Sequence, residues 1–128
     1  ASWVIEGGGK NIYFSGDSGY GPHFKEIGDK FGSFDFAMME CGQYGEKWTA
    51  IHMLPEQTIQ AAKDINAKAM MPIHWGAFTL AFHSWIDPVV RASKKAKEMN
   101  VPFYTPKIGE PIILEQPIPS SRWWESVQ

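Results

Sequence analysis

Two short motifs carry the side chains best suited to chemistry. Asp17 lies in the segment Gly-Asp-Ser-Gly (16–19), and His74 lies in the segment Pro-Ile-His-Trp-Gly (72–76). Each follows an apolar run where it gives way to a loop, and α/β folds place reactive groups at such junctions. A carboxylate and an imidazole from two such positions could bind one metal ion. Catalytic zinc takes three protein ligands and keeps one position for water, so these two residues would form part of a site.

Both side chains also have a structural interpretation. An aspartate between glycines is common in tight turns, and a neutral histidine at a strand end hydrogen-bonds readily without any metal. His52, just ahead of a predicted helix, could bind a substrate oxyanion or orient a metal ligand. His23 and His83 are weaker candidates. Cys41 is interpreted as a small buried residue, because the sequence shows no base near it.

Alternating strands and helices would position these residues. Glycines 7–9 predict an antiparallel hairpin between the first two strands, and successive strand and helix units predict an α/β domain on one sheet. The predicted strands are residues 2–5, 11–14, 34–39, 69–73, 102–104 and 112–114. Three helices are predicted, from Pro22 to about Phe31, from Pro55 to about Asn66, and from an Asp87-Pro88 cap to about Met99. The domain then spans 1–116. Residues 117–128 form an extended tail, with Trp123-Trp124 packed on a neighbouring segment.

Two loops, 40–54 and 75–86, exceed the typical length of about 4–6 residues, which indicates a functional or lid role. The second loop concentrates apolar side chains. They could pack under the tail, or they could form a wall for acyl chains or a patch that dips into a membrane interface. These side chains are Phe78, Leu80, Phe82, Trp85 and Ile86.

Composition excludes several function classes. The 128 residues carry a formal net charge of −2 and no basic block, so nucleic acid is not an expected partner. The single cysteine allows no internal disulfide, and a cytoplasmic setting is the default, with peripheral membrane association left open. No transmembrane segment is predicted, because no stretch approaches roughly 18 consecutive apolar residues.

The order of motifs resembles a known family. The segments 16–20 (Gly-Asp-Ser-Gly-Tyr), 51–56 (Ile-His-Met-Leu-Pro-Glu) and 72–78 (Pro-Ile-His-Trp-Gly-Ala-Phe) resemble the C-terminal half of metallo-β-lactamase-fold hydrolases. The branch they resemble contains enzymes similar to N-acyl-phosphatidylethanolamine-hydrolysing phospholipase D, and the resemblance covers about residues 2–111. It implies that residues 1–116 form half of an αβ/βα sandwich, with a mixed sheet, about three helices and a one- or two-zinc site at the sheet edge.

The resemblance also implies roles for three residues. Asp17 is similar to the carboxylate that bridges two zinc ions, His74 to the last histidine ligand of the second metal, and His52 to the active-site histidine beside the metals. Zinc would lower the pKa of a bound water and stabilise charge on the attacked phosphoryl group.

One departure from the family is large. The main metal motif, His-x-His-x-Asp-His, does not occur in these 128 residues. The resemblance therefore implies the C-terminal portion of a zinc-dependent phosphodiesterase for phospholipid-like substrates, which alone would not hold its zinc fully or turn over substrate. The expected partners are the missing N-terminal half and a second copy of the chain. A lactonase or sugar-phosphate hydrolase of the same fold, or a non-catalytic α/β binding module, remains an alternative.

Overall fold

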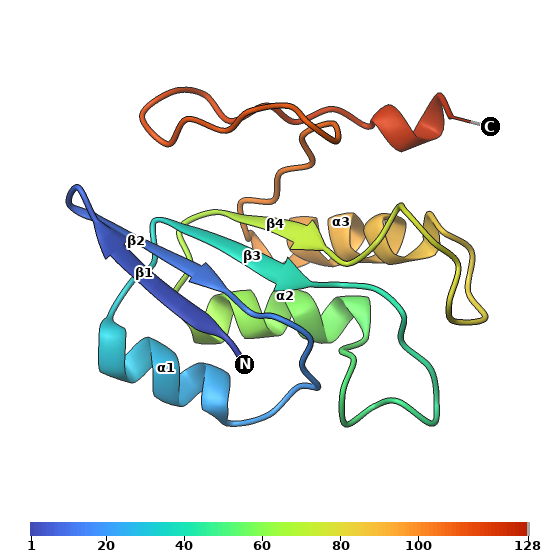
Figure 1. Ribbon diagram of the computed structural model, residues 1–128, viewed down its shortest axis with the longest axis horizontal. Coiled ribbons are helices and arrows are strands. Elements are labelled where there is room, and N and C mark those ends of the chain that lie inside the picture. Colours follow the sequence, from blue (N-terminus) through green and yellow to red (C-terminus); the bar gives the residue numbers. More distant parts are fainter. Residues whose placement is uncertain (128) are drawn as a thin grey trace.

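A four-stranded mixed sheet organises the chain, and the computed structural model describes residues 1–127 (Figure 1). The strands β1 (Trp3–Gly7), β2 (Lys10–Phe14), β3 (Phe36–Glu40) and β4 (Met70–Ile73) lie in the order β1-β2-β3-β4. β1 and β2 form the predicted antiparallel hairpin, whereas β2, β3 and β4 run parallel. The hairpin turns on Gly8 and Gly9, whose φ angles of 56° and 73° favour glycine. The predicted mixed α/β sheet is confirmed.

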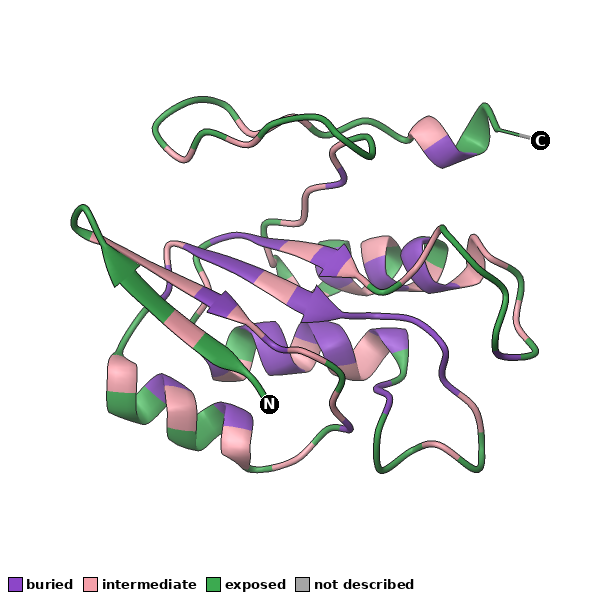
Figure 2. Ribbon diagram, in the orientation of Figure 1, coloured by how far each residue is buried: buried purple, intermediate pink, exposed green. Residues whose placement is uncertain are grey.

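Three helices complete the fold, as the sequence predicts. α1 (His23–Phe31) and α2 (Pro55–Asp64) connect the parallel strands and cover one face of the sheet, and α3 (Asp87–Met99) packs beside α2 (Figure 1). The buried residues between sheet and helices form one continuous core (Figure 2). Among its members are Tyr13, Ala37, Met39 and Met70 from the sheet and Phe24, Ile59 and Ala92 from the helices. None of the helices in residues 1–127 combines the length and apolarity that a membrane crossing needs.

The parallel connections decide where the functional loops lie. Phe14 pairs with Met38, and Glu40 pairs with Ile73, so the carboxyl ends of β2, β3 and β4 are close to level. The loops that follow these three strands therefore emerge at one edge of the sheet, the position at which α/β sheets bind ligands.

The helix ends largely follow the predicted signals. α1 begins one residue after Pro22 and ends before Gly32, which has a φ of 77°. Asp87 differs from its predicted role as a cap, because it is the first residue of α3 and makes no capping hydrogen bond. Its carboxylate instead accepts hydrogen bonds from the Tyr44 hydroxyl and the Arg91 guanidinium.

Two predicted strands are corrected, and the predicted tail is described up to residue 127. Residues 102–104 pair with the sheet only through a bridge between Phe103 and Met70, because prolines lie at 102 and 106 and lack the amide that a ladder needs. Residues 112–114 form no strand, and a turn bonds the Gln116 amide to the Ile113 carbonyl. The tail contains a short 3-10 helix, η1 (Trp123–Glu125). Its tryptophans do pack on a neighbour, Trp75.

Candidate metal centre

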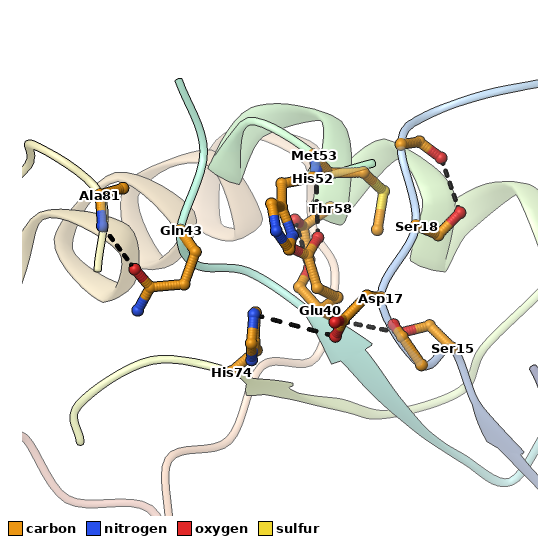
Figure 3. Close-up of polar contacts among 12 residues, drawn as sticks. Ser15, Asp17, Ser18, Glu40, Gln43, His52, Met53, Thr58, His74 and Ala81 are labelled. Carbon is orange, nitrogen blue, oxygen red and sulfur yellow. Dashed lines mark hydrogen bonds and ion pairs between the residues drawn. The ribbon is translucent and has the colours of Figure 1, made fainter. Parts of the chain in front are cut away.

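The structure brings Asp17 and His74 together at the carboxyl edge of the sheet (Figure 3). Asp17 Oδ1 and His74 Nε2 lie 3.8 Å apart, although 57 positions separate the residues in sequence. The Asp17 side chain is 62% exposed and the His74 side chain 33% exposed, so both face accessible space. The predicted proximity is met, while the role of these residues as metal ligands stays a prediction.

The turn that carries Asp17 is held from both sides. The Ser15 amide donates to the Met38 carbonyl at 3.0 Å, and the Ser15 hydroxyl accepts from the Glu40 amide at 2.8 Å. Gly19 packs against the loop 40–54, where an added Cβ would lie 2.5 Å from the Ala50 carbonyl oxygen. A side chain at position 19 would therefore push the aspartate turn away from the segment that leads to His52.

His74 has an unusual backbone conformation that a neighbouring glycine permits. Its φ of 67° is rare for a residue with a side chain, and such conformations cluster at functional sites. The Cys41 amide bonds the Ile73 carbonyl at 2.9 Å, which continues the parallel ladder up to this point. At Gly42 a Cβ would lie 2.0 Å from the His74 carbonyl oxygen, so only glycine leaves room for this backbone.

His52 completes the cluster through a buried carboxylate. Its ring stacks on the His74 ring with centroids 5.2 Å apart, and its Nδ1 lies 2.7 Å from Glu40 Oε1. The other Glu40 oxygen accepts from the Met53 amide at 3.0 Å. Because Glu40 occupies Nδ1, Nε2 is the nitrogen that His52 can offer to the site.

Burial shapes the electrostatics of this pair. Desolvation is the main cause that raises the pKa of Glu40 to about 8, against the opposing Met53 hydrogen bond. Desolvation also lowers the pKa of His52, and the neighbouring His74 lowers it further. Both groups therefore favour their neutral forms and share a proton across the 2.7 Å contact.

The donor set fits part of a zinc site. In a tetrahedral zinc site, bonds of about 2.0–2.2 Å to oxygen or nitrogen place two ligand atoms about 3.3–3.6 Å apart. The 3.8 Å between Asp17 Oδ1 and His74 Nε2 exceeds this by a few tenths of an ångström, so a small side-chain movement would let both bind one ion. Ligand atoms of Glu40, His52 and His74 also lie within 4.8 Å of one another. However, both Glu40 oxygens already have hydrogen-bond partners, His52 Nδ1 and the Met53 amide, so we assign Glu40 to holding His52 rather than to the metal.

Sequence reasoning missed Glu40, although a signal was present. Glu40 is a charged residue at the end of an apolar strand, the same junction that indicated Asp17 and His74. The weaker histidine candidates lie apart from the cluster: His23 contacts Ser18 at 3.1 Å, and His83 stacks on Tyr44 with centroids 4.1 Å apart. Cys41 is fully buried as expected, and burial raises the pKa of its thiol.

The chain is similar in sequence to known proteins. Residues 1–75 match the family model described as "Beta-lactamase superfamily domain". Outer membrane protein RomA of Klebsiella pneumoniae is 55% identical over 76 residues, which cover 59% of this chain and 58% of that protein. An uncharacterized protein of Mycobacterium tuberculosis is 35% identical over 127 residues, which cover 97% of this chain and 34% of that protein. The chain thus spans only part of the length of its relatives.

A named enzyme is more distant. N-acyl-phosphatidylethanolamine-hydrolyzing phospholipase D 1 of Caenorhabditis elegans is 32% identical over 83 residues, which cover 62% of this chain and 23% of that enzyme. Among solved structures, the metallo-beta-lactamase fold protein YhfI of Bacillus subtilis superposes with a TM-score of 0.59 at 21% identity. The match covers 80% of this chain and 39% of YhfI, which shows a shared fold.

A second solved structure shares the fold. A protein from Thermotoga maritima, described as a "putative zn-dependent hydrolase of the metallo-beta-lactamase superfamily", gives a TM-score of 0.54 at 25% identity. The match covers 73% of this chain and 43% of that hydrolase. The resemblance that the motifs indicated is confirmed, and this chain belongs to the beta-lactamase superfamily.

Proposed function

We propose that the chain forms the C-terminal portion of a zinc-dependent phosphodiesterase that acts on phospholipid-like substrates in the cytoplasm. The observation that carries this proposal is the 3.8 Å contact between Asp17 and His74, with the His52 ring stacked beside it. The similarity to a phospholipase of Caenorhabditis elegans supports the choice of substrate.

Each residue has a separate task in this proposal. Asp17 and His74 hold the metal, while donors outside these residues complete the coordination. A zinc ion held by these residues would supply Lewis-acid activation of water and of the phosphoryl group. His52 presents Nε2 to the substrate and stabilises its developing negative charge. Glu40 fixes the tautomer and orientation of the His52 ring through Nδ1.

A lactonase or a sugar-phosphate hydrolase would use the same metal residues. The loop after β4 favours a lipid, because its side chains Phe78, Leu80 and Phe82 are largely exposed rather than packed under the tail. Hydrolysis of lipid, lactone and sugar-phosphate panels by the full-length protein distinguishes these substrates. Preferred turnover of a sugar phosphate or a lactone would contradict the lipid proposal.

Two substitutions test the metal roles in the full-length protein. Asp17→Asn and His74→Ala should each abolish hydrolysis and lower the zinc content measured by atomic emission. Because both side chains are partly exposed, unfolding free energies should change by no more than about 0.5 kcal/mol. Asp29→Asn on α1 is the matched control, since Asp29 is exposed and pairs with Lys25 instead. Retained zinc and activity in Asp17→Asn would contradict the assignment, and the absence of stoichiometric zinc from the wild type would favour a non-catalytic binding module.

We also propose that the chain alone is inactive and associates with its missing half or with a second copy. Exposed apolar side chains on β1, Trp3 at 63% and Ile5 at 51% exposure, support an association surface there. Sedimentation over a wide concentration range tests this proposal. A well-behaved monomer throughout would show that it is wrong.

A further inference from the structure

The two long loops enclose a cavity of about 640 Å³ beside the candidate metal centre. Tyr44, Trp48 and Leu54 line it from the loop that precedes α2, and Ala81 and Phe82 line it from the loop that follows β4. Arg91 of α3 contributes a further wall. The volume lies within the range of about 300–1,000 Å³ that small-molecule sites occupy.

Hydrogen bonds fix the two loops to each other. The Gln43 carboxamide oxygen accepts from the Leu80 amide at 3.1 Å. It also accepts from the Ala81 amide at 2.9 Å (Figure 3). The Gln43 amide donates to His83 Nε2 at 3.1 Å, and the His83 ring stacks on Tyr44. Gln43 is only 7% exposed, so these bonds are shielded from water. The cavity is therefore formed in advance of ligand binding, which lowers the entropic cost of binding.

On the α3 side of the cavity the charges are already paired, whereas Glu46 and Lys47, which carry opposite charges, lie at its lining on the first loop. The Arg91 guanidinium binds both Glu56 oxygens, at 2.9 and 2.6 Å, and lies 5.1 Å from the centre of the Tyr44 ring. The Tyr44 hydroxyl bonds Asp87, so its polar end is engaged as well. A free anion finds no uncompensated charge on this wall. The aromatic and aliphatic side chains instead suit an uncharged hydrocarbon group.

The cavity begins one side chain away from the candidate metal centre. The Trp48 ring meets the His52 ring edge-on with centroids 6.1 Å apart, and the His52 amide donates to the Trp48 carbonyl at 2.8 Å. A group attached to a phosphoryl centre at Asp17 and His74 could therefore extend past His52 into the cavity.

We propose that this cavity holds one unbranched hydrocarbon chain of the substrate while its phosphodiester lies at the metal centre. The proposal rests on the proposed function and names the part of the substrate that this site selects. A sugar ring is disfavoured, because its hydroxyls would lose their water without matching hydrogen-bond partners.

Two measurements on the full-length protein test the cavity separately from the chemistry. In monoacyl phosphodiesters studied below micelle formation, KM should fall about fourfold for each added methylene, which corresponds to about 0.8 kcal/mol. Straight-chain alkanols, titrated by calorimetry, should bind with the same dependence on chain length. Hydrolysis with a KM independent of chain length, or no alkanol binding, overturns the cavity proposal. Alkanol binding without hydrolysis of any phosphodiester supports the cavity and overturns the proposed function.

A matched pair of phenylalanines on one loop sharpens the test. Phe82 lines the cavity and Phe78 does not, yet both side chains are largely exposed, so neither truncation should prevent folding. Phe82→Ala should weaken alkanol binding and reduce the dependence of KM on chain length, whereas Phe78→Ala should leave both unchanged. Equal losses in the two variants would overturn the proposal and favour insertion of the whole loop into a lipid surface.

Discussion

Opposite edges of the same sheet hold acidic side chains in very different states. At the amino end of β3, Asp35 accepts from the Asn11 amide and from the Lys68 ammonium, each at 2.9 Å, and these bonds lower the pKa of Asp35. At the carboxyl edge, Asp17 is 62% exposed and faces His74, and burial raises the pKa of Glu40.

This comparison separates an acid whose charge is compensated within the fold from acids that could take part in the proposed chemistry. The Asn11 amide and the Lys68 ammonium bond the Asp35 carboxylate, so it is not free to bind a metal or a substrate. At the other edge, Asp17 keeps its oxygens accessible, and the buried Glu40 favours its neutral form. Perturbed acids and imidazoles at the carboxyl ends of parallel strands are the expected composition of a catalytic site.

Outside the two proposed metal ligands, the largest effect should come from changing how the backbone packs at the carboxyl ends of the strands. Gly42→Ala places a Cβ 2.0 Å from the His74 carbonyl oxygen, so His74 must move. Displacement of a reacting group by about 1 Å costs roughly 10²-fold in rate, and overpacking costs about 1–3 kcal/mol of unfolding free energy. Activity assays and urea denaturation of the full-length protein measure both. Gly7→Ala is the control, because nothing lies within 4 Å of its added Cβ. Unchanged turnover in Gly42→Ala would show that His74 does not need this position.

Glu40→Gln should give the next largest loss, because it changes the partner of His52 without changing the volume. A carboxamide can donate to Nδ1 but has no proton to transfer to it, so the ring cannot gain positive charge as negative charge develops on the substrate, and hydrolysis should fall about 10- to 100-fold. Stability should change little, since the amide can still accept from Met53. Nitrogen NMR shifts of the His52 ring report whether Nδ1 carries a proton, which a purely structural role would not alter. Glu98→Gln, on an exposed part of α3, is the control, and full activity in Glu40→Gln would refute the positioning role.

A smaller effect should follow from Thr58→Val, which removes the hydroxyl that donates to the Glu40 carbonyl at 2.7 Å. The loss of this buried hydrogen bond should lower the unfolding free energy by about 0.5–1.5 kcal/mol. Turnover should change far less than in Glu40→Gln, because the Glu40 side chain keeps its contacts. Thr79→Val on the exposed loop provides the comparison in the same denaturation assay. A loss of activity as large as that of Glu40→Gln would indicate that the backbone, rather than the carboxyl group, positions His52.

Asp35, at the amino end of β3, should give the protein only a modest dependence of stability on pH. The pKa of Asp35 in the folded chain lies below its ordinary value of 3.8. Its contribution to stability is therefore present above that value and is lost as the pH falls through the lower folded pKa. Asp35→Asn should lower the melting temperature at neutral pH, and the difference from wild type should shrink in acid. A melting-temperature difference that stays constant across the pH series would show that the charge of Asp35 does not contribute to stability. Hydrolysis by Asp35→Asn at neutral pH should equal that of the wild type.

Much of the fold follows from local signals. Glycines 7–9 specify the hairpin, and prolines at 22, 55 and 88 mark the beginnings of three helices within a residue or two. The predicted strands at 102–104 and 112–114 fail because apolar character alone does not supply a partner strand. Prolines interrupt both segments or border them, and the edge of β4 accepts only a single bridge at Phe103.

The site was predictable only in part. Asp17 and His74 each follow an apolar strand, so their order and residue types are enough to indicate a shared edge. Glu40 follows the same rule, but its function depends on contacts with His52 and Met53 that lie 12 and 13 positions away. Gln43 has no sequence signal at all, because its role comes from the amides of a loop that is 37 and 38 positions distant.

The amino-acid sequence by itself determined the order of strands and helices, the candidate metal ligands Asp17 and His74, and the family. These depend on short-range patterns and on the residues of short motifs. Tertiary structure alone decided the separation of Asp17 and His74, the burial of Glu40 and the shape of the apolar cavity. These properties depend on how distant segments pack, and the free energy of such contacts is set by the water and the partners that surround each group in three dimensions.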